Sequence, residues 1–129
     1  MKTEVLHLVL VTAFTGLMWL PYILDRIKVW GIADTVGYPA QPKPQTPWAE
    51  RMKAAHANGV ENLVVFAALV LAAQVVGIST GVTVAACIIY FWARVVHFVA
   101  YTLALPWIRT VGFTVGFFCQ AALVWQLLA

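Results

Sequence analysis

The chain has 129 residues, of which 63% are hydrophobic and 10% are charged, and its formal net charge at pH 7 is +3. Soluble domains contain about 45–50% apolar and roughly 25% charged residues, and a domain this small cannot bury the additional apolar surface. The composition therefore excludes a soluble enzyme, a disordered tail and a disulfide-stapled secreted module, argues against a nucleic-acid binder, and indicates a protein embedded in a lipid bilayer.

The first hydrophobic run covers residues 5–24, close to the ~20 residues that span the hydrocarbon core as a helix. No small-residue cleavage site follows this run, so we expect a retained helix rather than a signal peptide. Residues 25–47 are polar and contain prolines at positions 39, 42, 44 and 47. Because closely spaced prolines prevent a continuing helix, this region is predicted to be a surface loop.

Three further helices are predicted after this loop. Pro47 suits the first turn of a helix, and the pattern that follows extends this helix over residues 48–76. At ~1.5 Å per residue the helix reaches ~43 Å, longer than the ~30 Å hydrocarbon core, so it should protrude into water at its start. Apolar runs at 83–105 and 107–128, separated by Pro106, predict the last two helices.

The expected fold is one domain, residues 1–129, of the all-α class: an integral membrane protein built as a four-transmembrane-helix bundle. The basic residues indicate how this bundle is oriented. Only Lys2 precedes the first run, whereas six basic residues lie in or beside the first and third loops: Arg26, Lys28, Lys43, Arg51, Lys53 and Arg109. The positive-inside rule then predicts a multi-pass protein whose loop 25–47 faces the cytoplasm, with both termini on the opposite side.

Two stripes of polar side chains lie at membrane depth, where an ionisable group costs several kcal/mol and needs a partner or a function. At ~100° per residue, an arc of about 100° on the second helix contains Arg51, Asn58, Glu61 and Asn62. An arc of about 60° on the third helix contains Tyr90, Arg94, His97 and Tyr101. The stripe on the second helix mixes a cation, a carboxylate and two amides, which suits a polar ligand with both charge signs and peptide bonds. The stripe on the third helix must face protein or a wet cavity. The alternative is that Arg51 or Arg94 pairs with Glu61 only to fix the packing of the helices.

The two stripes also resemble a known family. The second helix contains the motif Glu50-Arg51-x-x-x-Ala55-His56-x-Asn58-x-x-Glu61-Asn62. This motif resembles the signature of the MAPEG family, the membrane-associated proteins in eicosanoid and glutathione metabolism. The third helix resembles the prostaglandin E synthase branch of that family through the motif Arg94-x-x-His97-x-x-Ala100-Tyr101. The resemblance covers nearly the whole chain, including a basic residue, Arg109, at the start of the fourth helix.

The resemblance implies a bundle that assembles as a homotrimer and binds glutathione as a co-substrate between subunits, in a cleft open to the cytoplasm and without a metal. Arg109 resembles the arginine credited with stabilising the glutathione thiolate, and we expect Tyr101 to donate a hydrogen bond to the thiol. The glutathione-binding residues expected from the matched positions are Arg26, Arg51, Asn58, Glu61, Asn62, Arg94, His97 and Tyr101.

The expected function is that of a membrane-bound glutathione transferase or peroxidase-like enzyme, in which the glutathione thiol attacks a small apolar electrophile that arrives from the membrane lipid. Many members carry a second arginine three residues after the one that matches Arg51, and here that residue is Ala54. The first alternative is therefore a non-catalytic membrane bundle that kept the fold. The second alternative is a small four-helix transporter, for which Glu61 is the sole candidate for the proton-coupling carboxylate.

Overall fold

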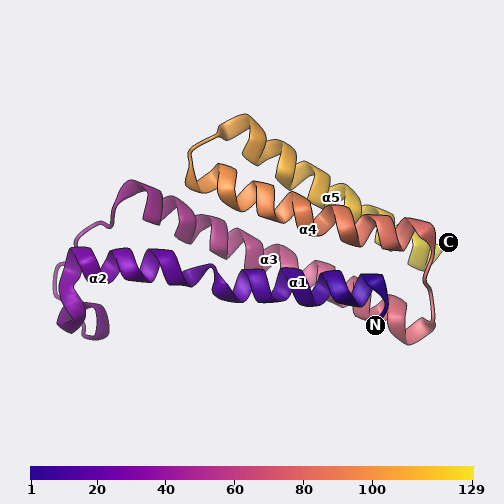
Figure 1. Cartoon of the computed structure of the whole chain (residues 1–129), viewed down its shortest axis with the longest axis horizontal. Helices are drawn as coiled ribbons and strands as arrows, with labels where there is room; N and C mark the ends of the chain where they lie inside the picture. Colours follow the sequence, from indigo (N-terminus) through magenta and orange to yellow (C-terminus); the bar gives the residue numbers. More distant parts are fainter.

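The computed structural model describes residues 1–129, which form five helices and no strand. The helices are α1 (Thr3–Leu17), α2 (Trp19–Val36), α3 (Pro47–Val76), α4 (Gly81–Thr102) and α5 (Pro106–Leu128). Only Met18 separates α1 from α2, and the two lie nearly in line (Figure 1). When α1 and α2 are counted as one unit, the chain has four segments that are long and apolar enough to span a membrane. This confirms the predicted all-α membrane fold.

The loop predicted at residues 25–47 is too long, because α2 continues through the first half of that range. Polar residues such as Asp25 form helix as readily as they form loop, and no proline lies between Pro21 and Pro39 to prevent it. Regular helix is interrupted only at Gly31, whose φ of 80° suits glycine. The connection to α3 is therefore confined to residues 37–46, where the prolines are concentrated.

A buried carboxylate fastens this connection to the start of α3. Asp25 accepts hydrogen bonds from the backbone N–H of Thr46 at 3.1 Å, from the Thr46 hydroxyl, and from the side-chain amide of Gln45 at 3.3 Å. Glu50, in the first turn of α3, accepts a further bond from the backbone N–H of Gln45 at 3.1 Å. These contacts supply acceptors at the α3 N-terminus, where Pro47 occupies the first turn as predicted.

The helices predicted at 83–105 and 107–128 correspond to α4 and α5. At the start of α4, Thr80 and Thr83 exchange side-chain and backbone hydrogen bonds as a capping box. Glu4 of α1 is buried there and accepts bonds from the hydroxyls of Ser79 at 2.6 Å and Thr83 at 2.8 Å. This network ties the first helix to the start of the third spanning segment.

Both termini and the α3–α4 turn lie at one end of the bundle, and the α2–α3 loop and the α4–α5 turn lie at the other (Figure 1). The six basic residues assigned to the first and third loops therefore gather at one end, as predicted, while the cytoplasmic location of that end stays a prediction. At this end α2 and the first turns of α3 extend beyond the α4–α5 pair, in agreement with the long second spanning helix.

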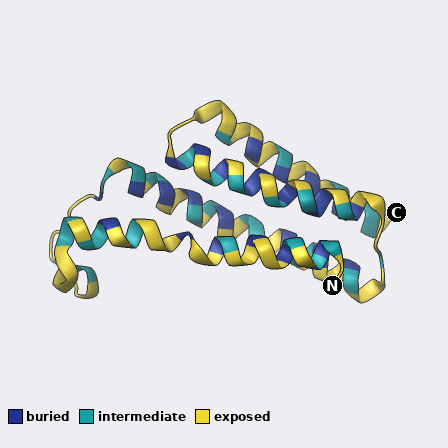
Figure 2. Cartoon of the chain, viewed as in Figure 1, coloured by how far each residue is buried: buried dark blue, intermediate teal, exposed yellow.

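The apolar core lies where α1, α3, α4 and α5 meet, and its buried members are Leu8, Val11, Phe66, Val70, Ala86, Cys87, Tyr90, Cys119 and Leu123. At its centre the rings of Phe66 and Tyr90 stack with their centroids 3.8 Å apart. Most other large apolar side chains are exposed on the outer faces of the helices (Figure 2). This distribution is typical of a bundle whose outer surface is in contact with lipid rather than with water.

Candidate functional site

The charged side chain of Arg94 lies inside the bundle, with an exposed fraction of only 3%. Its Nη2 atom donates a hydrogen bond to Oδ1 of Asn58 on α3 at 2.6 Å and lies 3.2 Å from Nδ1 of His97, one turn further along α4. Both partners are neutral groups, and Glu61, the acid expected to pair with it in a purely structural role, is exposed. A buried cation without a counter-ion is unfavourable, and an anionic ligand would supply the missing charge.

Two glycines of α5 allow the helices to enclose this arginine. A Cβ atom at Gly112 would lie 3.1 Å from both the carbonyl oxygen of Ala93 and the backbone nitrogen of His97, so any larger residue would require these backbone atoms to shift. One turn further, a Cβ atom at Gly116 would lie 3.7 Å from Cδ of Arg94. The close crossing of α4 and α5 thus covers the stem of Arg94 and fixes the backbone that carries His97.

Arg109 lies in the first turn of α5 and faces back toward α4. Its guanidinium carbon is 4.8 Å from the centroid of the Tyr101 ring, a cation–π contact. Tyr101 and Arg109 both line a cavity of about 320 Å³, whose other lining residues are Asn58, His97, Thr110 and Phe113. They also line a second cavity of about 200 Å³, together with Arg51, Ala100, Ala104, Leu105 and Pro106.

Polar residues of α3 form hydrogen bonds to α4 and α5. Arg51 donates from Nε to the backbone carbonyl of Thr102 at the end of α4, over 2.9 Å, and lines the smaller cavity. The side-chain amide of Asn62 donates to the backbone carbonyl of Asn58 at 2.9 Å. The backbone carbonyl of Asn62 accepts a bond from Nε2 of Gln120 at 3.1 Å. Neither Arg51 nor Arg94 pairs with Glu61, so the alternative in which such an ion pair fixes the helix packing does not hold in the single chain.

The sequence model of the MAPEG family matches residues 8–129. The chain belongs to the MAPEG family. This confirms the resemblance of the two helix motifs, and it agrees with an integral, multi-pass membrane protein. The family includes glutathione transferases and related enzymes. No individual curated protein matched the chain.

In this MAPEG chain the two polar cavities are lined by five of the residues expected at the site: Arg51, Asn58, His97, Tyr101 and Arg109. Arg94 lines neither cavity and is joined to the larger one through its contacts with Asn58 and His97. Asn62 lies behind Asn58 and supports it through their hydrogen bond. Glu61 and Arg26 line neither cavity. Glu61 is exposed on α3, and the guanidinium of Arg26 stacks on Trp30 of α2 with 4.4 Å from its central carbon to the ring centroid.

The sequence patterns did not single out three residues beside the site, namely Thr110, Phe113 and Gln120. Gln120 is buried and follows Gly112 and Gly116 at intervals of four residues, so all three share one face of α5. An amide in an otherwise apolar run, on the same face as two glycines, is the signal that could have identified it. Thr110 and Phe113 carry no such signal, because nothing in the pattern separates them from lipid-facing neighbours.

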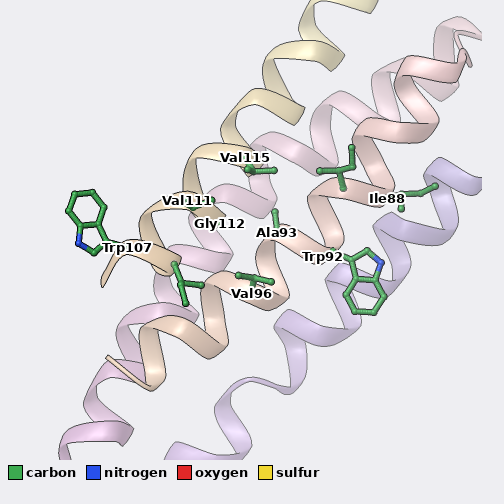
Figure 3. Close-up of a pocket in the computed structure, with 10 residues that line it drawn as sticks. Ile88, Trp92, Ala93, Val96, Trp107, Val111, Gly112 and Val115 are labelled. Carbon is green, nitrogen blue, oxygen red and sulfur yellow. The ribbon is translucent and has the colours of Figure 1, made fainter. Parts of the chain in front are cut away.

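A larger, apolar groove lies on the α4–α5 pair of the MAPEG chain and has a volume of about 470 Å³. Figure 3 shows its lining, which includes Ile88, Trp92, Val96, Trp107, Val111 and Val115. The groove has almost no polar surface and offers no binding group for an anion. Ala93 and Gly112 also line it, and His97, against which Gly112 packs, lines the polar cavity. The apolar groove and the polar cavity are thus separated only by the contact between two helices.

Proposed function

We propose that this MAPEG protein is a membrane-bound, glutathione-dependent transferase or peroxidase-like enzyme that activates the glutathione thiol for attack on an apolar electrophile. The observation that carries the proposal is Arg94, a buried cation with only neutral partners next to a polar cavity. Glutathione has two carboxylates, peptide amides and one ammonium group, so its chemistry matches this mixture of charged and amide side chains. Membership of the family supports the same choice of ligand.

Binding is assigned to side chains of α3 and α4. Arg94 supplies the charge for one glutathione carboxylate, and Asn58 and His97, which share the same hydrogen-bond cluster, contact the peptide groups. Arg51 uses one guanidinium nitrogen for Thr102, which leaves its other nitrogens for the second carboxylate. Ala54, which replaces an arginine of many family members, is exposed on α3. The substitution therefore removes no side chain from the cavities formed by one chain.

Activation of the thiol is assigned to Arg109 and Tyr101. A free thiol has a pKa of about 8.5, so only a few per cent is present as the reactive thiolate near neutral pH. The guanidinium of Arg109 favours the anion, and lowering the pKa by one to two units corresponds to about 1.4–2.7 kcal/mol. Tyr101, held against Arg109, donates its phenolic hydrogen to the sulfur. The thiolate then forms a carbon–sulfur bond to the electrophile, which either expels a leaving group or takes up a proton. With a peroxide, the sulfur attacks one oxygen, the O–O bond breaks and the departing alkoxide takes up a proton; a second glutathione then converts the resulting sulfenic acid to the disulfide with release of water.

The apolar groove supports the choice of a membrane-dissolved electrophile as the second substrate. Its lining is apolar and it borders the contact between α4 and α5 that encloses the polar cavity. An apolar molecule partitions from the bilayer into such a groove without losing hydrogen bonds to water. The substrate class is therefore an uncharged, lipid-soluble compound with one electrophilic carbon or a peroxide bond.

The proposal also includes a homotrimer in which glutathione lies between subunits. Glu61 and Ala54 lie two turns apart on one exposed face of α3. Glu61 is 15 residues from the end of the helix at Val76, about 22 Å into a core of ~30 Å. A carboxylate in contact with acyl chains at that depth is unfavourable, and a neighbouring subunit would cover it.

Conjugation of glutathione to a model aryl halide tests the enzymatic proposal. Purified protein should exceed the uncatalysed rate, and Arg109→Ala should lower kcat at least tenfold with a smaller change in the KM for glutathione, because it removes the thiolate stabiliser. Lys2→Ala removes one cation at the opposite end of the bundle and should retain full activity. If the wild-type protein matches the uncatalysed rate with several electrophiles and with peroxides, the chain is a non-catalytic bundle instead.

A further inference from the structure

The bundle has a second basic surface, at the junction of α2 with the α2–α3 loop, formed by Arg26, Trp30 and Lys43. Two nearby carboxylates, Asp25 and Glu50, accept hydrogen bonds from neutral donors of the loop. They stabilise the start of α3, and neither forms an ion pair with a neighbouring cation. The cations of this end therefore have no acidic partner among these two groups.

Within this surface the arginine is held in place but is not satisfied. The guanidinium of Arg26 lies on the Trp30 ring, 4.4 Å from the centroid, and its Nε atom is buried without any hydrogen-bond partner. Trp30 is itself fixed, because its indole N–H donates to the backbone carbonyl of Lys43 at 2.8 Å. One turn earlier on α2, the Tyr22 hydroxyl lies 2.7 Å from Nδ1 of His56 on α3, which holds the two helices together. Arg26 is thus a preorganised donor group that lacks an acceptor.

The depth of this surface corresponds to the phosphate level of a bilayer. Arg26 lies 23 residues after Thr3, where α1 begins, so it is about 35 Å from that end of the unit. The hydrocarbon core is ~30 Å thick and the headgroup regions extend the bilayer to ~40–45 Å, which places Arg26 just beyond the acyl chains. Leu20 and Leu24, in the two preceding turns, are exposed and apolar, as expected for residues that contact acyl chains.

We propose that Arg26, Trp30 and Lys43 bind the phosphate of an anionic phospholipid. The phosphodiester oxygens supply the acceptors that the Arg26 guanidinium lacks, and Lys43 adds a second positive charge. Asp34, which shares the small cavity beside Trp30 and Lys43, offsets one of these two charges. This site is independent of the proposed glutathione site, because Arg26 lines neither of the two polar cavities.

Native mass spectrometry and thermal unfolding of the full-length protein in detergent, without glutathione, test this site. Phosphatidylglycerol should remain bound and raise the unfolding midpoint of the wild type, whereas phosphatidylcholine and inorganic phosphate should not. Arg26→Gln should weaken phosphatidylglycerol binding at least fivefold, while Lys2→Gln, the same loss of charge at the other end, should leave it unchanged. Lys43→Gln, in the exposed loop, should weaken binding at least twofold without affecting folding.

Three results would overturn the assignment. Undiminished phosphatidylglycerol binding in both Arg26→Gln and Lys43→Gln would mean that the lipid binds elsewhere. An equal shift with phosphatidylcholine would show that acyl chains alone account for binding. An equal shift with inorganic phosphate would identify a site for a soluble anion and not for a lipid. If Arg26→Gln does not fold, Lys43→Gln decides alone, because its side chain takes part in no contact of the core.

Discussion

Arg94 is surrounded by neutral groups, and the proposed glutathione carboxylate is its only counter-ion. A hydrogen bond to a charged group contributes about 1.5–3 kcal/mol, which corresponds to a 10- to 100-fold change in affinity. Arg94→Met should therefore raise the glutathione dissociation constant by that factor in isothermal titration calorimetry. Because methionine fills similar space without a charge to desolvate, the unfolding midpoint should not fall. An unchanged dissociation constant would exclude Arg94 from the ligand site.

The positions of single residues were predictable only in part. Helical spacing placed Arg94, His97 and Tyr101 on one inward face, because three polar groups at membrane depth leave no other choice. The same spacing grouped Glu61 with Asn58, yet a difference of 60° around α3 is enough to leave Glu61 exposed. Which edge of a polar stripe is buried depends on the neighbouring helices, and the sequence of one helix does not contain that information.

At the scale of helices, the crossing of α4 and α5 at Gly112 sets the geometry of the site. A methyl group there would press on the backbone of Ala93 and His97 at 3.1 Å, whereas at Gly116 the nearest atoms are side-chain atoms at 3.7 Å. Gly112→Ala should destabilise the protein by about 1–3 kcal/mol, the usual range for overpacking, and reduce conjugation activity by displacing His97. Gly116→Ala is the matched control. It should change the stability much less in thermal unfolding, and the conjugation rate much less in activity assays. Equal effects of the two substitutions would contradict this role of the crossing.

The contact between α2 and α3 depends on the carboxylate of Asp25. Removing it in Asp25→Ala leaves the backbone N–H and the hydroxyl of Thr46 without their acceptor, while the side-chain amide of Gln45 keeps its bond to the backbone carbonyl of Tyr22. We expect a loss of about 0.5–2 kcal/mol in the free energy of unfolding, as for other helix caps, and faster hydrogen exchange at the Thr46 amide. Asp34→Ala, an exposed acid of the same helix, serves as control and should change neither quantity. Equal exchange rates in the two variants would show that Asp25 is not the cap.

The helices themselves were largely predictable, since long apolar runs and prolines define where spanning segments can begin and end. Pro47 and Pro106 start α3 and α5 as expected. The loop predicted at residues 25–47 was too long because polar composition does not distinguish an exposed helix, such as the second half of α2, from a loop. The contacts that hold residues 25–30 as helix, such as Asp25 with Thr46, join positions about twenty residues apart, and local patterns do not report them.

For the molecule as a whole, the exposed carboxylate of Glu61 and the exposed face around it predict association with further copies. Native mass spectrometry of the protein in mild detergent should give the mass of a homotrimer. Glu61→Lys reverses the charge on the face that the neighbouring subunit would cover and should reduce the trimer fraction. Glu50→Lys, at the water-exposed start of α3, is the control and should leave the trimer fraction unchanged. A monomer that remains folded and active would contradict the proposed intersubunit site.

We propose that the cavity between Tyr101 and Arg109 binds glutathione and ionises its thiol. The ultraviolet absorbance of the thiolate, followed as glutathione is added to the wild-type protein at a series of pH values, reports this ionisation. We expect a saturable thiolate signal whose pKa lies at least one unit below the value of about 8.5 for a free thiol, and the loss of this shift in Arg109→Ala. A bound thiol that titrates at the free value, or no saturable signal, would contradict it.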